Sequence, residues 1–255
     1  MTVLTVSILF FLGAIFGSFI NVVIDRLPRG ESFLKGRSHC ENCKKEIKSY
    51  DLFPIFSFLM LKGKCRFCKK PISRRTIGME IFTGFLFVLL YSQAFPDLVL
   101  FSFLCAASLI ILAIAVIDID YGIIPDVLLV VLGLITALYL WYFLPQAFIS
   151  HLIAGGCVLL FFLIIFFITK GRGIGFGDVK YAFFIGLFLG GPLTIVAMYG
   201  AFLTGALISI ILIVLRKKRL KGSTVPFGPF LSLGMFISIV WGQPILAFVS
   251  PYVYL

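Results

Sequence analysis

Long apolar runs separated by short polar breaks dominate the chain from end to end. The first run covers Thr2 to Ile24, and a segment rich in charged residues follows from Arg26 to about Gly78. Seven further apolar runs fill the rest of the chain, at about 79–96, 98–117, 123–144, 149–169, 179–191, 194–215 and 229–249. Because a helix needs about 20 apolar residues to cross a bilayer, this pattern predicts an all-α polytopic membrane protein with one polar insert after its first helix.

The number of crossings depends on the run 179–191, which would extend only about 20 Å along a helix axis. All 22 Lys and Arg residues fall within 26–75, 170–180 and 216–221. The positive-inside rule places all three cationic segments in the cytoplasm only if 179–191 also crosses. We therefore expect about eight transmembrane helices, with both termini outside.

Composition narrows the class of protein further. Hydrophobic residues make up 61% of the chain and charged residues 13%, which excludes a soluble globular domain, a disordered chain and a secreted disulfide scaffold. The cations behind the net charge of +11 are confined to these three segments, so they indicate topology and contact with membrane lipids, and we expect no nucleic-acid partner. No cation precedes the first run, which favours a retained helix over a cleaved signal peptide. Within that helix, Gly13 and Gly17 would let another helix approach closely.

Two C-x2-C pairs lie in the charged segment. Their cysteines are Cys40, Cys43, Cys65 and Cys68. Four thiolates with this spacing suit tetrahedral Zn²⁺, and a metal would stabilise a segment too small to build a generous core. Disulfides are disfavoured in the cytoplasm, where the charge pattern places the segment. The pattern favours a structural zinc site, with unmetallated or redox-active cysteines as the alternative.

Four aspartates, Asp118, Asp120, Asp126 and Asp178, lie at the predicted cytoplasmic ends of spans. Asp118 closes the third crossing, and Asp178 opens the sixth after a glycine-rich turn. Two crossings separate them, so both return to one membrane face. Carboxyl groups at membrane depth are costly and are candidate functional groups. Two that share a site hold one proton between them, which is how aspartic proteases activate water.

Two other interpretations of these aspartates stay open at this point. They could cap helix starts in headgroup water, above all Asp120 and Asp126. Asp118 and Asp178 could instead form the proton relay of a transporter. The glycines before Asp178 do not indicate a phosphate-binding loop, since no strand precedes them and no Lys-Ser/Thr follows.

Five motifs follow one another in an order that resembles a known family. They are GAIFGSFINVVIDRLP at 13–28, the two cysteine pairs with Gly63-Lys64 before the second, IDIDYGIIPD at 117–126, GFGDVK at 175–180 and PFGPFL at 226–231. Together they resemble the bacterial type IV prepilin peptidases, which are GxGD aspartyl proteases. The likeness covers nearly the whole chain.

The resemblance implies an endopeptidase of the bacterial plasma (inner) membrane. It would cut the basic leader of prepilins and pseudopilins at the cytoplasmic face, after Gly and usually before Phe. The implied catalytic pair is Asp118 and Asp178. The candidate supporting residues are Asp120, Asp126, Gly175, Gly177 and Lys180.

The resemblance also implies a second activity, in which S-adenosylmethionine methylates the new N-terminus. Gly63, Lys64 and the four cysteines match positions tied to that methyl transfer or to the integrity of the insert. The expected organisation is a first helix at 1–25, an insert at 26–78 and a seven-helix peptidase core at 79–255. The rival hypotheses are a peptidase without methyltransferase activity, a proton-coupled transporter, and a non-enzymatic assembly component that docks through its zinc insert.

Overall fold

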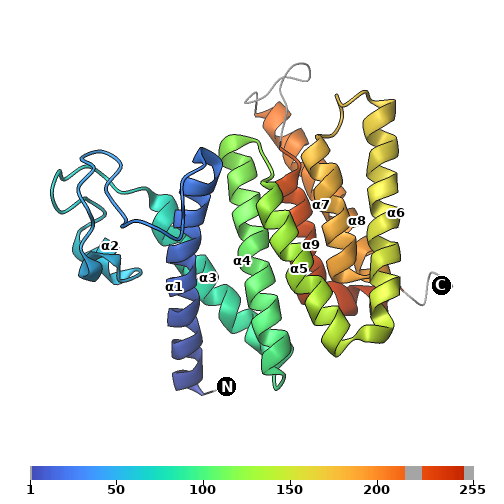
Figure 1. Ribbon diagram of the computed structural model, residues 1–255, viewed down its shortest axis with the longest axis horizontal. Helices are drawn as coiled ribbons and strands as arrows, with labels where there is room; N and C mark the ends of the chain where they lie inside the picture. Colours follow the sequence, from blue (N-terminus) through green and yellow to red (C-terminus); the bar gives the residue numbers. More distant parts are fainter. Residues whose placement is uncertain (1, 216–225, 250–255) are drawn as a thin grey trace. The chain divides into compact units, whose positions relative to one another are not determined.

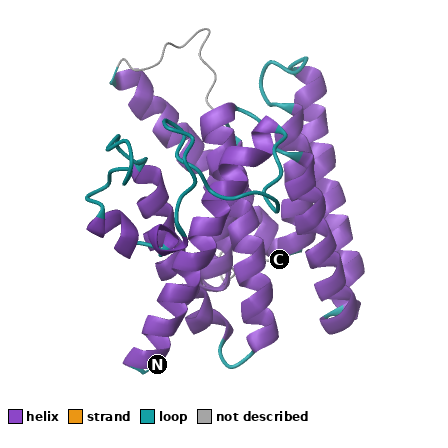
Figure 2. Ribbon diagram, turned by 60° about the vertical axis from the view of Figure 1, so that its left-hand side comes forward, coloured by secondary structure: helices purple, strands orange, loops and turns teal. Residues whose placement is uncertain are grey.

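The computed structural model describes residues 2–215 and 226–249, which consist of helices joined by loops (Figures 1 and 2). The long helices are α1 (Val3–Arg26), α3 (Arg74–Ala94), α4 (Leu98–Tyr121), α5 (Asp126–Phe143), α6 (Phe148–Ile168), α8 (Gly191–Val214) and α9 (Gly228–Val249). The shorter elements are α2 (Phe56–Met60), α7 (Phe176–Leu189) and the 3₁₀ turns η1 (Leu27–Arg29), η2 (Ser49–Leu52) and η3 (Pro145–Ala147). The prediction of an all-helical chain with an insert after its first helix is confirmed.

Seven of the described helices are long and apolar enough to cross a membrane, so this is a multi-pass membrane protein. The remaining apolar run forms α7, which has only 14 residues. The expectation that this run also crosses rests partly on the cations at 216–221, which lie outside the described residues. An eighth crossing and the orientation of the chain stay predictions.

One helix boundary differs from the predicted one by several residues. Helix α3 begins at Arg74, five positions before the apolar run at 79. Ser73 precedes it as N-cap, and its side chain accepts a hydrogen bond from the backbone N–H of Arg75 at 3.2 Å. A capping serine supplies an acceptor for a free N–H at the start of a helix. The helix can therefore begin among polar residues, before the apolar run that predicted it.

The chain divides into two compact units, residues 1–109 and 110–255. In the first unit, α1 packs closely on α3. A side chain on Gly13 or Gly17 would collide with the α3 backbone or with the Thr83 side chain, at distances of 2.4 Å and 2.0 Å. The prediction that these glycines permit a close helix contact is therefore confirmed.

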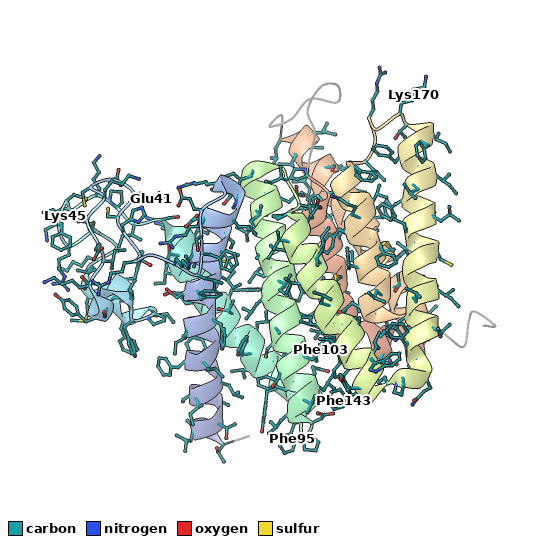
Figure 3. The ribbon with its side chains drawn as sticks, in the orientation of Figure 1. Glu41, Lys45, Phe95, Phe103, Phe143 and Lys170 are labelled. Carbon is teal, nitrogen blue, oxygen red and sulfur yellow. The ribbon has the colours of Figure 1, made fainter. Side chains whose placement is uncertain are left out.

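The second unit is built around α7. Tyr181, Ala182 and Ile185 have no exposed surface, and a side chain on Gly186 would collide with the backbone of Gly155 in α6. At one end of this unit lies Phe143, and at the other lies Lys170 (Figure 3). Helix α5 starts at Asp126 and ends at Phe143, so the carboxylates of the GFGD and IDID motifs belong to the end that carries Lys170.

Candidate active site

Asp118 lies in the last turn of α4 and is held by the first residue of α9. Its carboxyl group is buried, with 5% of the residue exposed. The backbone N–H of Gly228 donates a hydrogen bond to its Oδ2 at 3.0 Å. A β-carbon on Gly228 would lie only 2.6 Å from the same oxygen, so the contact requires glycine.

Asp178 lies in the first turn of α7, where the amide dipoles of a helix favour negative charge. The residue is 8% exposed, and its Oδ2 accepts a hydrogen bond from the backbone N–H of Gly175 at 3.2 Å. Gly175 is the N-cap of α7. A β-carbon on Gly177 would contact Ile124 at 3.3 Å, so the turn packs tightly against the loop that follows α4.

The two buried carboxyl groups interact with each other. The charge of Asp118 acts on Asp178, although 60 positions separate them in the sequence. Within residues 2–215 and 226–249, each carboxyl group accepts a hydrogen bond from one backbone N–H and forms no ion pair. Since two like charges in a poorly hydrated site resist joint ionisation, the pair is suited to hold one proton.

The remaining candidate residues of the two motifs lie at the surface. Asp126 is the first residue of α5 and forms an ion pair with Lys180 of α7. This pair therefore joins α5 to α7 beside the site. Asp120 is exposed in the last turn of α4. The structure thus brings Asp118 and Asp178 together and gives Asp126 and Lys180 a separate contact.

Two buried residues that the sequence analysis missed support the same helices. The hydroxyl of Tyr181, three positions after Asp178, lies 2.9 Å from Oγ of Ser232. Ser232 in turn donates to the carbonyl oxygen of Ile111 at 3.4 Å. These contacts join α7, α9 and α4 just below the carboxyl pair. The sequence could have indicated Ser232, because it follows Gly228 by four positions and therefore lies on the same face of α9.

The four cysteines of the insert form a second candidate site. Their Sγ atoms all lie within 4.8 Å of one another, and those of Cys40 and Cys68 are 3.8 Å apart. A tetrahedral Zn²⁺ with Zn–S distances of about 2.3 Å requires sulfur atoms about 3.8 Å apart. Hydrogen bonds from the backbone N–H groups of Cys68 and Phe67 lower the pKa of Cys65 to about 6, which favours a thiolate. The cluster can therefore bind a metal ion.

The two cysteine pairs are copies of one hairpin. Residues 40–47 and 65–72 share the pattern C-x-x-C-K-K-x-I. In each copy the first cysteine donates its N–H to the fifth following residue, at 3.0 Å for Cys40 and 2.8 Å for Cys65. Lys44 and Lys69 both have positive φ. The repeat is present in the sequence itself, so the pattern predicts two similar hairpins.

Gly63 and Lys64 belong to the second hairpin. Gly63 has a φ of +66°, and a β-carbon there would lie 3.0 Å from the ring of Phe58. Lys64 forms an isolated β-bridge with Pro71. The space over Gly63 is thus filled by the insert's own side chain, and these two residues show no cradle for a nucleoside cofactor.

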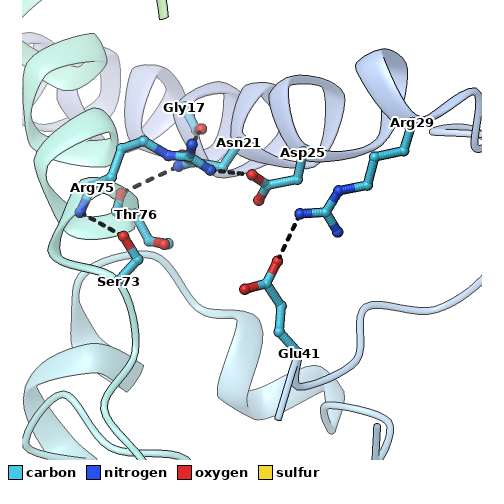
Figure 4. Close-up of polar contacts among 8 residues, drawn as sticks. All are labelled: Gly17, Asn21, Asp25, Arg29, Glu41, Ser73, Arg75 and Thr76. Carbon is cyan, nitrogen blue, oxygen red and sulfur yellow. Dashed lines mark hydrogen bonds and ion pairs between the residues drawn. The ribbon is translucent and has the colours of Figure 1, made fainter. Parts of the chain in front are cut away.

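A polar cluster ties the insert to the ends of α1 and α3 (Figure 4). Arg75 of α3 forms an ion pair with Asp25 of α1. The amide nitrogen of Asn21 donates to the carbonyl oxygens of Gly17 and Thr76, at 3.1 Å and 3.3 Å. Beside these contacts, Arg29 forms an ion pair with Glu41 of the first cysteine hairpin at 3.4 Å.

Comparisons with known proteins match both parts of the chain. Residues 11–94 match the bacterial peptidase A24 N-terminal domain, and residues 103–210 match the type IV leader peptidase family. A prepilin leader peptidase/N-methyltransferase of Bacillus subtilis (strain 168) is 33% identical over 95% of this chain and 96% of its own length. Proteins of the same name from Aeromonas hydrophila and Stutzerimonas stutzeri are 30% and 28% identical, over 94% and 92% of this chain and 91% and 90% of theirs. No solved protein structure matches the chain significantly.

Proposed function

Because this chain belongs to the type IV leader peptidase family, we propose that Asp118 and Asp178 are the carboxyl pair with which it cuts the leader from prepilins or pseudopilins. Over nearly its whole length the chain is similar to proteins named prepilin leader peptidase/N-methyltransferase, and seven of its described helices could cross a membrane. The observation that supports the residue assignment is the burial of two carboxyl groups, each with a backbone N–H hydrogen bond, close enough for the charge of Asp118 to act on Asp178.

The carboxyl pair has the parts that hydrolysis of a peptide needs. One carboxylate takes a proton from a water molecule, whose oxygen attacks the carbonyl carbon of the scissile peptide. The protonated carboxyl group stabilises the developing oxyanion, and a proton passes to the leaving amine as the C–N bond breaks. The products are a free carboxyl end on the leader and a free amine on the mature protein. No metal takes part in these steps.

The supporting residues act by position in this proposal. Gly228 and Gly175 orient the two carboxyl groups through their N–H groups, and Gly177 lets the turn pack on Ile124. The ion pair of Asp126 and Lys180 fixes α5 against α7 at the edge of the site. Asp120 is exposed in the last turn of α4, and its proposed role is to attract the basic leader.

For the insert we propose structural zinc bound by Cys40, Cys43, Cys65 and Cys68. The support is the gathering of all four Sγ atoms within 4.8 Å, with two of them at the 3.8 Å separation of a tetrahedral site. The metal would hold together two hairpins that contain few buried apolar residues. Zinc has no catalytic step in this proposal.

We propose that the chain also methylates the new N-terminus, because its relatives are named N-methyltransferases, and that S-adenosylmethionine is the methyl donor. Gly63 and Lys64 are proposed to serve this activity by shaping the second hairpin, since the space over Gly63 is filled by Phe58. We assign no step of the methyl transfer to these residues.

The proposed setting is the bacterial plasma (inner) membrane, with the carboxyl pair at the cytoplasmic face and both termini outside. The support is the confinement of the cations to three loops. The division into a first helix at 1–25, an insert at 26–78 and a peptidase core at 79–255 is part of the same proposal. Cations of the insert are proposed to contact anionic lipids.

The test is cleavage of a purified model prepilin by the purified protein with lipid, comparing the wild type with the variants Asp118→Asn and Asp178→Asn. Glu31→Gln, which neutralises an exposed carboxylate of the insert, is the matched control. Loss of cleavage in both Asn variants, with cleavage kept in the control, supports the assignment. Normal cleavage by both Asn variants would show that the pair is not catalytic.

A further inference from the structure

Within the charged insert lies a stretch that is as apolar as a transmembrane helix. Residues 52–61 read LFPIFSFLML and contain no charged side chain. Asp51, which is paired with Arg66, directly precedes the stretch, and Lys62 directly follows it. Ten residues are too few to cross a bilayer, and such runs belong to buried core or to membrane-interfacial segments.

The stretch is not buried core, because its large side chains point away from the protein. The exposed apolar residues along it are Leu52, Phe53, Phe56, Leu59 and Met60. Met60, at the end of α2, is 81% exposed. An apolar patch of this kind on a described surface marks a contact with another apolar phase.

The exposed face adjoins exposed apolar side chains of α1. The ring of Phe56 stacks on that of Phe11 with 5.9 Å between centroids, and Phe11 lies in the first half of α1. At 1.5 Å per residue, Phe11 is about 22 Å along the axis from Arg26, where the cations begin. Helix α2 lies beside the middle of α1 in Figure 1. It therefore lies at a depth that hydrocarbon occupies.

Irregular backbone at that depth needs partners for its polar groups, since lipid offers none. The turn before α2 meets this requirement. Pro54 has no N–H, and the N–H of Ile55 donates to Oε2 of Glu80 in α3 at 2.7 Å. Glu80 is only 4% exposed, and its carboxylate also interacts with the side chain of Ser18. Ser57 is buried and its hydroxyl donates to the carbonyl oxygen of Phe53.

We propose that residues 52–61 form a hook embedded in the acyl chains of the leaflet next to the insert, and that the carboxylate of Glu80 anchors it. The occupant of the exposed face is lipid. Lys62 directly follows the hook, and its long aliphatic stem lets the ammonium group reach toward the polar side of the leaflet. Glu80 thereby gains a role that peptide hydrolysis does not require, and the insert becomes a membrane-inserted element.

The test measures depth with a single tryptophan. In the Trp141→Phe/Trp241→Phe background, Met60→Trp is compared with Leu34→Trp, both reconstituted in vesicles of phosphatidylcholine with or without bromine on the acyl chains. Leu34 is a matched control, because it is also apolar, lies in the insert and is 78% exposed. The hook predicts blue-shifted emission and strong bromine quenching for Met60→Trp. It predicts red-shifted emission and quenching by aqueous acrylamide for Leu34→Trp.

Acrylamide quenching of Met60→Trp without bromine quenching would overturn the proposal, since the face would then be open to water and to a protein partner. The anchoring role of Glu80 is tested with the same Met60→Trp probe. Glu80→Gln keeps an acceptor oxygen for Ile55 and should keep the bromine quenching, whereas Glu80→Ala should lose most of it. Unchanged quenching in Glu80→Ala would overturn the role of Glu80. Neither readout depends on cleavage, so failure here is distinct from failure of the peptidase assignment.

Discussion

The backbone nitrogen of Gly228 lies 3.0 Å from Oδ2 of Asp118, although 110 positions separate the two residues in the sequence. The start of α9 thus positions a carboxyl group at the end of α4. The contact gives the PFGPFL motif a physical role. It brings a backbone donor to Asp118 where any side chain would stand in the way.

Replacement of Gly228 by Ala should reduce cleavage strongly. The added β-carbon would lie 2.6 Å from Oδ2, so the carboxyl group must shift, and a displacement of this order can lower a rate by about 100-fold. Initial rates on a model prepilin would measure the effect. Gly156→Ala in α6 is the control, because nothing lies within 4 Å of its added carbon. Equal rates in the two variants would contradict a positioning role for Gly228.

The contact between Tyr181 and Ser232 should contribute to stability more than to chemistry. Tyr181→Phe removes a buried hydrogen bond, which costs about 1 kcal/mol, with a similar loss for Ser232→Ala. The double variant should lose less than the sum of the single ones, because both remove one interaction. Unfolding in lipid or detergent would give the three values. Strict additivity would mean that the hydroxyls act independently.

Zinc analysis of the purified protein should find about one ion per chain. Cys65→Ser should lose it, since three thiolates leave the tetrahedral site incomplete. Cys157→Ser should retain it, because Cys157 lies in α6 outside the cluster. Elemental analysis after removal of loosely bound metal distinguishes the two variants. A metal-free wild type with intact thiols would contradict the zinc assignment.

The close packing of α1 on α3 should fail when Gly17 gains a side chain. Gly17→Val places carbon 2.0 Å from Oγ1 of Thr83, and overpacking of this kind typically costs about 1–3 kcal/mol. Gly78→Ala in α3 meets no atom within 4 Å and should be neutral. Thermal unfolding of both variants would compare them. If the Gly17→Val variant were as stable as the Gly78→Ala variant, the close contact between α1 and α3 would not contribute to the stability of the protein.

The sequence was sufficient for features that depend on local pattern. Apolar runs predicted the long helices, Gly13 and Gly17 predicted a close helix contact, and the parity of crossings brought Asp118 and Asp178 to one face. Features that depend on distant contacts could not be predicted. The hydrogen bond from Gly228 to Asp118 closes a loop of 110 positions, and no periodicity reports it.

The hook was missed for a different reason. Its ten apolar residues lie between dense charges, so the segment reads as polar when averaged over the insert. The exposure of Met60 and the bond from Ile55 to Glu80 become apparent only when α1 and α3 are assembled.

The shortness of α7 bears on how the second reactant, water, reaches the carboxyl pair. Measured from the contact between Gly155 and Gly186, α6 continues for 13 residues to Ile168, whereas Asp178 lies 8 residues away. At 1.5 Å per residue, Asp178 is recessed by about 7 Å from the end of its neighbour. Because α7 lies inside its unit, where Tyr181, Ala182 and Ile185 have no exposed surface, neighbouring helices and not lipid bound this recess. Access of water to the aspartates therefore depends on the helix ends around the recess, and we expect the rate of cleavage to depend little on the acyl-chain length of the host membrane.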